Sequence, residues 1–133
     1  MIAVDTNVIA YYWIKSEFSE LAERLFEKDN DWVAPYLWRS ELRNVLSLYY
    51  RNNLLSEKDA ILTMKKGQDF IKNKEHSVST EKIFDYITKS TLSSYDCEFV
   101  SLAKDLNVSL ITSDKKIISS FPNIAISLST YVN

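Results

Sequence analysis

Two acidic residues follow short apolar segments, at positions where an acid is well placed to bind a ligand. Asp5 directly follows the apolar run 1–4, and Asp114 comes two residues after the apolar segment 109–112. Both segments are predicted to be buried strands, and parallel strands end at the same edge of a sheet, where loops and helix N-termini surround a ligand. The sequence therefore predicts Asp5 and Asp114 at one edge of a sheet.

Two further acids are predicted on the apolar sides of helices. With an advance of about 100° per residue, Glu41 falls in the apolar half of a helix over 35–51, and Asp96 falls in the apolar arc of a helix over 94–106. The first apolar half also contains Leu37, Trp38, Leu42, Val45, Leu46, Leu48 and Tyr49, and the second contains Tyr95, Phe99, Val100, Leu102, Ala103 and Leu106. Ser101 falls on the polar side of the second helix. Glu41 and Asp96 are therefore expected to point inward.

Inward carboxylates need a partner, because an unpaired buried charge is costly. No Lys or Arg shares the apolar arc of either acid, so a divalent cation shared by Asp5, Glu41, Asp96 and Asp114 is the simplest partner. A ligand set made only of oxygen atoms suits Mg²⁺ or Mn²⁺. Such an ion polarises a phosphate and lowers the pKa of a bound water, so the pattern indicates phosphodiester hydrolysis.

Composition limits the other possibilities. The chain has 133 residues, 46% hydrophobic and 26% charged, and is predicted to form a single domain over 1–133. Its net charge of −2 gives no chain-wide case for nucleic-acid binding, so any such site must be local. One cysteine, Cys97, excludes an internal disulfide, and one histidine, His76, cannot form an imidazole metal site alone. We expect a cytoplasmic protein without a membrane segment.

Strand and helix patterns alternate along the chain. The predicted strands cover 1–4, 32–34, 76–79, 109–112 and 124–127, and the predicted helices cover 8–13, 18–26, 35–51, 56–71, 80–89, 94–106 and 114–119. Thr6 or Asn7 is expected to cap the first helix and Pro35 to open the third, while Gly67 weakens the fourth and Asn107 ends the sixth. This alternation predicts an α/β three-layer sandwich, with a mostly parallel sheet of four to five strands between helices.

Four segments carry a resemblance to a known family. They are Asp5-Thr6-Asn7-Val8-Ile9, the helix segment 40–46 around Glu41, the segment 92–103 around Asp96, and Leu110-Ile111-Thr112-Ser113-Asp114. Together, in this order and spacing, they closely resemble PIN-domain ribonucleases, and most of all the VapC-type toxins of toxin–antitoxin pairs. The resemblance covers essentially the whole chain.

The resemblance implies an endoribonuclease that depends on Mg²⁺ or Mn²⁺, with Asp5, Glu41, Asp96 and Asp114 as its acidic cluster. It also implies supporting roles for Asn7, after the first acid, and for the hydroxyl of Thr112. Similar toxins form homodimers and are held inactive by a small antitoxin protein that inserts a segment into the active-site groove. Two departures from the family pattern leave the acids intact: Asn107 stands where Gly is frequent, and Cys97 where Ala is more usual.

Each residue also has a structural interpretation. Asp5 is suited to cap a helix, Asp96 to complement a helix dipole and Asp114 to form a turn, whereas a structural Glu41 needs an unseen Arg partner. The pair Lys115 and Lys116 is placed either to contact RNA or to face solvent. Cys97 and Tyr95 are expected to pack in the interior, and His76 to lie at the surface or at a strand edge.

Two other functions share parts of this pattern. A housekeeping PIN nuclease without an antitoxin uses the same chemistry, and a short reading frame upstream distinguishes the two. A non-enzymatic, receiver-like phosphoacceptor domain also has an Asp at a strand end. That domain, however, needs acids clustered after its first strand and a Lys after a late strand, whereas this chain has inward acids on helices.

Overall fold

A five-stranded parallel sheet forms the centre of the fold. We describe it from a computed structural model that covers all residues, 1–133. The strands are β1 (Ile2–Val4), β2 (Trp32–Pro35), β3 (Glu75–His76), β4 (Leu110–Thr112) and β5 (Ala125–Ser127). Their order across the sheet is β3-β2-β1-β4-β5, and every neighbouring pair is parallel. The predicted parallel α/β architecture is confirmed.

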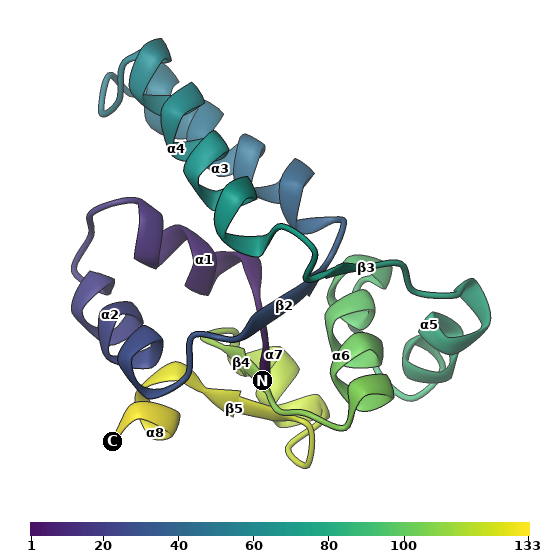
Figure 1. The fold of residues 1–133 in the computed structure, drawn as a ribbon. Coiled ribbons are helices and arrows are strands. Elements are labelled where there is room, and N and C mark those ends of the chain that lie inside the picture. The colour runs from purple at the N-terminus through teal and green to yellow at the C-terminus, as the bar shows by residue number, and fades with distance from the viewer.

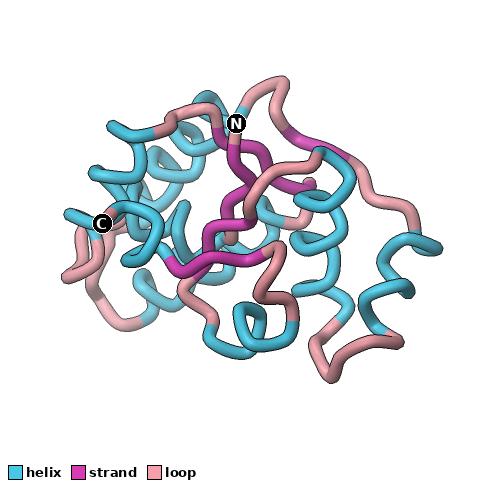
Figure 2. The backbone as a smooth tube through the Cα atoms, turned by 90° about the horizontal axis from the view of Figure 1, so that it is seen from below, coloured by secondary structure: helices cyan, strands magenta, loops and turns pink.

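Helices cover both faces of this sheet. They are α1 (Thr6–Trp13), α2 (Ser19–Lys28), α3 (Trp38–Arg51), α4 (Glu57–Ile71), α5 (Thr80–Ile87), α6 (Ser94–Leu106), α7 (Lys115–Ser120) and α8 (Leu128–Val132). Figure 1 shows α1 and α2 on one side of the strands and α6 and α5 on the other. Figure 2, which looks from below, shows the strands enclosed by helices. None of these helices is both long and apolar enough to cross a membrane.

Burial explains why the strand segments read as continuous apolar runs. Every residue of β1, β2 and β4 is buried, as expected for a parallel sheet with helices on both faces. Helix α6 contacts β1, β2 and β4, and α1 contacts β4 from the other side. The core therefore lies on both faces of the three central strands, and the loops at their ends are positioned by it.

The long hairpin of α3 and α4 projects from the body of the protein (Figure 1). Helix α4 continues unbroken through Gly67, which is buried against Trp38 and Leu42 of α3. Leu48, predicted on the buried half of α3, is instead 50% exposed, because the apolar half of the helix extends beyond the face that α4 covers. The hairpin thus carries apolar side chains that nothing in this chain covers.

Pro35 ends a strand instead of opening a helix, so this prediction is wrong. It is the last residue of β2, and α3 begins three residues later at Trp38. The backbone N–H groups of Ala34 and Tyr36 donate to the carbonyls of Lys74, just before β3, and His76, within it, so the position between them faces away from that strand. The missing N–H of Pro35 therefore removes no bond from the β2–β3 ladder.

Side chains cap several of the helices. Those of Ser56, Ser79 and Ser93 cap α4, α5 and α6. Asn107 ends α6 in the left-handed conformation (φ 54°, ψ 46°), as predicted. The cap of α1 is Asp5, not Thr6 or Asn7. The short helix α8, capped by Ser127, was not predicted, since five residues show too little periodicity.

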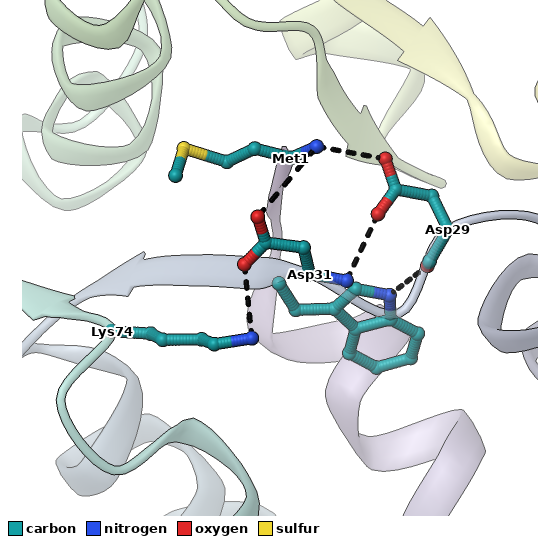
Figure 3. Close-up of polar contacts among 5 residues, drawn as sticks. Met1, Asp29, Asp31 and Lys74 are labelled. Atoms are coloured by element: carbon teal, nitrogen blue, oxygen red, sulfur yellow. Dashed lines mark hydrogen bonds and ion pairs between the residues drawn. The ribbon is translucent and has the colours of Figure 1, made fainter.

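A cluster of charges joins the amino ends of three strands (Figure 3). The N-terminal ammonium of Met1 lies 3.0 Å from Asp29 Oδ2 and 3.8 Å from Asp31 Oδ2, and Lys74 Nζ lies 2.9 Å from Asp31 Oδ1. The indole N–H of Trp32 donates to the carbonyl of Asp29 at 2.7 Å. Exposed ion pairs stabilise a fold only weakly. This cluster therefore mainly aligns β1, β2 and β3 at the edge opposite the candidate site.

Candidate active site

A cleft of about 640 Å³ lies over the carboxyl edge of the sheet, between α1, α3 and α6. All four predicted acids line it, together with other polar residues. The lining residues are Asp5, Thr6, Asn7, Leu37, Ser40, Glu41, Asn44, Val45, Tyr95, Asp96 and Asp114. Residues from both strand ends and both helices are thus brought together, as the sequence predicts.

Asp5 is the most deeply buried of the four acids, with 7% of its surface exposed. Its Oδ1 accepts a hydrogen bond from the backbone N–H of Thr6 at 2.7 Å, and its Oδ2 accepts one from the hydroxyl of Thr112 at 2.7 Å. Thr112 is fully buried in β4, beside β1. The side chain of Asp5 therefore both caps α1 and is held rigidly at the floor of the cleft.

Glu41 is oriented by a hydroxyl from another element. It lies in the first turn of α3, half-buried, and its Oε1 accepts a hydrogen bond from Thr6 Oγ1 at 2.7 Å. Thr6 is buried at the start of α1, immediately after Asp5. No arginine or lysine pairs with Glu41 in the structure. The ion-pair interpretation of Glu41 is therefore not supported.

Asp96 and Asp114 lie at the starts of two helices. Asp96 is in the first turn of α6, half-buried, and its backbone N–H donates to the cap Ser93 at 3.1 Å. Asp114 caps α7: its Oδ1 accepts from the backbone N–H groups of Lys116 (2.8 Å) and Ile117 (3.3 Å). Its own N–H donates to Thr112 at 3.0 Å, so one hydroxyl links the first and last acids.

The acids are close enough to repel one another. Burial raises the pKa of Asp5 to about 6, and the charges of Glu41 and Asp96 act in the same direction against the hydrogen bonds from Thr112 and Thr6. Burial, with the charge of Asp96, also raises the pKa of Glu41. Burial and the charge of Asp114 raise the pKa of Asp96. Each of these three carboxylates would thus be stabilised by a cation in the cleft.

The oxygen atoms in the cleft are of the kind that a hard divalent cation binds, but they are not already arranged around a common point. The four acids and the nearby hydroxyls offer only oxygen, the ligand that Mg²⁺ and Mn²⁺ prefer. No three His, Cys, Asp or Glu side chains lie close enough together to hold an ion as they stand. Carboxylates that repel one another are expected to sit apart, so a cation would have to draw these side chains together.

Several cleft residues were missed or misplaced by the sequence patterns. Ser40 and Asn44 lie four residues apart on α3 and line the cleft beside Glu41. Residues four apart share one side of a helix, so a helical projection could have placed both near the cleft once Glu41 was assigned to it. Tyr95 was expected to pack in the interior but is 59% exposed in the cleft.

Ser101, outside the cleft, was predicted on the polar side of α6 and is instead buried. Helix α6 contacts both the sheet and α5, so its buried surface is wider than one arc.

The remaining candidates take structural positions. Cys97 is fully buried in the core, as predicted. His76 lies in the short edge strand β3, partly exposed, and is not among the residues that line the cleft. Asn7, predicted as a supporting residue, is exposed and lines the cleft. The positive charge of Lys116 partly opposes the rise in the pKa of Asp96, so a positive charge borders the acids.

The raised pKa of Asp5 predicts that mild acid stabilises the protein. The folded state binds a proton at Asp5 more tightly than the unfolded chain (ordinary pKa 3.8), so this stabilisation is lost as the pH rises through about 6. We expect the free energy of unfolding, measured with urea in EDTA, to be about 1 kcal/mol higher at pH 5 than at pH 7. Asp5→Asn should reduce this difference, and a difference of opposite sign would contradict the arrangement.

The range from pH 5 to pH 7 distinguishes Asp5, whose pKa is raised by folding, from acids whose pKa is lowered by folding. Hydrogen bonds from Arg39 lower the pKa of Glu75, and a hydrogen bond from Lys74 lowers the pKa of Asp31. Their stabilising contributions are lost only below the ordinary pKa values of 4.5 and 3.8. Between pH 5 and 7 they contribute almost nothing to the change.

Fold and cleft together define the class of protein: a parallel α/β domain that presents carboxylates at the carboxyl edge of its sheet. Residues 2–124 match the PIN domain, and the chain belongs to that family. It is also 29% identical, over 124 residues, to Ribonuclease VapC3 of Pyrobaculum aerophilum, covering 91% of this chain and 95% of that protein. The resemblance inferred from the sequence motifs is confirmed.

Solved structures share the fold at low sequence identity. PAE2754 of Pyrobaculum aerophilum superposes with a TM-score of 0.77 at 16% identity, covering 98% of this chain and 92% of that one. FitAcB of Neisseria gonorrhoeae gives a TM-score of 0.77 at 15% identity, with coverage of 97% and 99%. A chain of FitAB bound to an IR36 DNA fragment gives 0.73 at 16%, with coverage of 96% and 95%. These matches establish the fold of the chain.

Proposed function

We propose that residues 1–133 form a single nuclease domain that hydrolyses phosphodiester bonds of RNA with the help of Mg²⁺ or Mn²⁺. The observation that carries the proposal is the cleft lined by Asp5, Glu41, Asp96 and Asp114, with no basic side chain paired to Glu41 or Asp96. Membership of the PIN family and similarity to a VapC ribonuclease support it. Glu41 and Asp96 would hold the ion with Asp5 and Asp114, and Asn7 and Thr112 would support them.

The residues of the chain have distinct parts in this chemistry. Thr112 and Thr6 hold the carboxylates of Asp5 and Glu41 by hydrogen bonds, which limits their rotation when substrate enters. Lys116 borders the acids and is placed to attract the RNA backbone toward an otherwise negative cleft. When bound, a divalent ion supplies positive charge for the phosphate and acidity for an attacking water.

Adding cation should stabilise the folded protein. Burial and the charges of neighbouring acids raise the pKa values of Asp5, Glu41 and Asp96. A cation that binds only the folded state reduces the repulsion between these carboxylates and so stabilises that state. We expect millimolar Mn²⁺ or Mg²⁺ to raise the melting temperature at pH 7.5 relative to EDTA. Na⁺ at matched ionic strength should give a much smaller shift. An equal shift with Na⁺, or none with Mn²⁺, would count against the metal site.

The activity itself is tested with purified protein and single-stranded RNA. Cleavage should require added Mg²⁺ or Mn²⁺ and stop with EDTA, because the chain offers no imidazole in the cleft to act in place of the ion. Internal cuts, seen as paired products from an RNA labelled at one end and then at the other, would identify an endonuclease. Failure to cut any RNA in the presence of either ion would refute the proposal.

We propose a toxin role, which the similarity to VapC3 and one feature of the surface support. The hairpin of α3 and α4 exposes apolar side chains, which is typical of surfaces that bind other proteins. The exposed residues are Leu48, Tyr50, Leu54, Ile61 and Leu62. We assign this protein a cytoplasmic toxin function, as a homodimer held inactive by a small antitoxin. A short reading frame immediately upstream, whose product copurifies with this chain and blocks cleavage, would support it.

The alternative within the same chemistry is a housekeeping PIN nuclease without an antitoxin. Absence of such an upstream frame, together with normal growth of cells that express the chain alone, would favour it. The receiver-like interpretation is not supported, because two of the clustered acids come from α3 and α6 and the chain belongs to the PIN family.

A further inference from the structure

Tyr95 is an exposed aromatic side chain in the acidic cleft. It is the second residue of α6, directly before Asp96, and 59% of its surface is exposed. It makes no hydrogen bond through its hydroxyl and stacks on no other ring. A single exposed aromatic side chain is ordinary on a protein surface, so what distinguishes Tyr95 is its place in the acidic cleft, where its ring is free to contact a bound molecule.

Most other tyrosines of the chain have an identifiable partner, which sets Tyr95 apart. Tyr11, Tyr12 and Tyr86 pair with aromatic rings, and Tyr36, Tyr86 and Tyr131 lie near the charged groups of Arg39, Lys89 and Lys28. Tyr49 is partly buried against the core. Tyr36 and Tyr50 are comparably exposed, but Tyr36 lies near Arg39, and Tyr50 lines a groove between α3 and α4 instead of the cleft.

The backbone that carries Tyr95 is well fixed. Ser93 caps α6 through the backbone N–H of Asp96, and the next residue, Cys97, is fully buried in the core. The ring is therefore attached to a rigid helix start and loses only its own side-chain freedom when it binds. Ser40 and Asn44 of α3 line the same cleft and offer hydrogen-bonding groups.

We propose that Tyr95 is a stacking platform for an unpaired nucleobase next to the phosphate that is cut. This inference rests on the proposed nuclease function and names the form of RNA that the cleft accepts. A base and a phosphate of one nucleotide are covalently linked, so a ring adjacent to Asp96 is suitably placed to hold the base while the acids act on the phosphate. Bases in a duplex already stack on each other and cannot reach the ring. The cleft should therefore select single-stranded RNA.

The same ring is a poorer candidate for contact with a protein partner. The exposed apolar residues of this chain that resemble a protein interface gather on the α3–α4 hairpin, whereas the cleft is lined mainly by polar and acidic side chains. Exposed aromatic rings with hydrogen-bonding groups beside them are used by proteins to stack and hold single-stranded bases.

The test compares Tyr95→Ala with Tyr95→Phe, and uses as a control Phe84→Ala, which removes an exposed ring of α5 outside the cleft and outside the hairpin. Binding is measured by fluorescence anisotropy in Mn²⁺ with a short single-stranded RNA, in an Asp96→Asn background that keeps the RNA intact. Loss of one base stack costs about 1–3 kcal/mol, so Tyr95→Ala should raise Kd about tenfold. Tyr95→Phe keeps the ring and should bind within twofold of the parent, as should Phe84→Ala.

An abasic scan locates the stacked base. In a series of RNAs, each lacking one base, a single position should weaken binding to the parent protein about as much as Tyr95→Ala does. The same RNA should lose little further affinity when Tyr95→Ala is introduced, because the two changes remove one contact. In steady-state cleavage without the Asp96→Asn change, Tyr95→Ala should raise KM more than it lowers kcat.

Several results would overturn the inference. Equal binding by Tyr95→Ala and Tyr95→Phe would show that the ring does not stack, and equal losses on duplex and single-stranded RNA would show a general effect. Loss of antitoxin binding with unchanged RNA binding would assign the ring to a protein contact. The nuclease function survives each of these results, provided the parent protein still cleaves RNA in Mn²⁺. It fails if the parent protein cuts no RNA in the presence of Mg²⁺ or Mn²⁺.

Discussion

Asp96→Asn is expected to lower the rate of RNA cleavage at least about a hundredfold, since a divalent ion supplies several kcal/mol of transition-state stabilisation and each 1.36 kcal/mol is tenfold in rate. Asp96 faces the cleft from the first turn of α6, and burial raises its pKa with help from the charge of Asp114. An amide keeps the shape of the side chain but has no charge to hold a cation. The measurement is the single-turnover rate in saturating Mn²⁺.

The fold should survive this substitution. The backbone N–H of Asp96, not its side chain, binds the cap Ser93, so helix α6 keeps its start. Removing one of several repelling carboxylates should leave the melting temperature in EDTA unchanged or higher. The Mn²⁺-dependent rise in melting temperature should shrink at the same time, which separates loss of the ion from loss of structure.

Asp105→Asn is a matched control on the same helix. Asp105 lies near the other end of α6, where its carboxylate pairs with Lys82 at 3.0 Å on the surface. An exposed pair of this kind contributes roughly 0–1 kcal/mol. Cleavage by Asp105→Asn should therefore match the parent protein. If Asp96→Asn cleaved RNA as fast as the parent protein and the Asp105→Asn control, the acidic cleft would not be the catalytic site.

Glu75→Ala is expected to destabilise the protein by about 1–3 kcal/mol, because it leaves the buried indole N–H of Trp38 without its acceptor. Glu75 Oε2 accepts from the indole N–H of Trp38 at 2.7 Å, and its two oxygens accept from Arg39 at 2.6 Å each. The side chain of Glu75 is 5% exposed, and Trp38 is fully buried. The free energy of unfolding by urea measures the loss.

These contacts join β3 to the first turn of α3, the turn that carries Glu41. Glu75→Ala should therefore also lower cleavage at temperatures where the protein stays folded, by letting that turn move. Arg39→Ala should cost less stability, because the side chain of Arg39 is 38% exposed and Glu75 keeps its bond to Trp38. If both variants lost the same free energy of unfolding, the ion pair with Arg39, and not the unpaired indole N–H of Trp38, would account for the effect of Glu75→Ala.

The order of residues along the chain was sufficient to predict most elements and the identity of the acids. Asp5 and Asp114 follow continuous apolar runs, and Glu41 and Asp96 interrupt apolar helix faces that have a period of 3.6 residues; both are local patterns. The segment 94–106 was predicted with the bounds that α6 shows. Burial on both faces makes such patterns strong, so they are visible without knowledge of neighbours.

Predictions failed where long-range packing outweighs local preference. Pro35 belongs to β2 because its neighbours bond to β3, and Ser101 is buried because α6 contacts more than one element. Leu48 and Tyr95 are exposed because no element covers those stretches of α3 and α6. Each outcome depends on which element is a neighbour, and periodicity within one segment carries no information about that.

The sequence by itself determined which carboxylates face inward and which strands are buried, since those properties follow from the spacing of apolar residues. Only the tertiary structure decided that Thr112 holds Asp5, that Thr6 holds Glu41, and that Tyr95 lies in the same cleft. Thr6 and Glu41 are 35 positions apart in the sequence, and Asp5 and Thr112 are 107 positions apart. Hydrogen bonds between such distant residues depend on the strand order β3-β2-β1-β4-β5 and on the helices that cover the sheet. That order is set by the packing of the whole core, to which every element contributes at once.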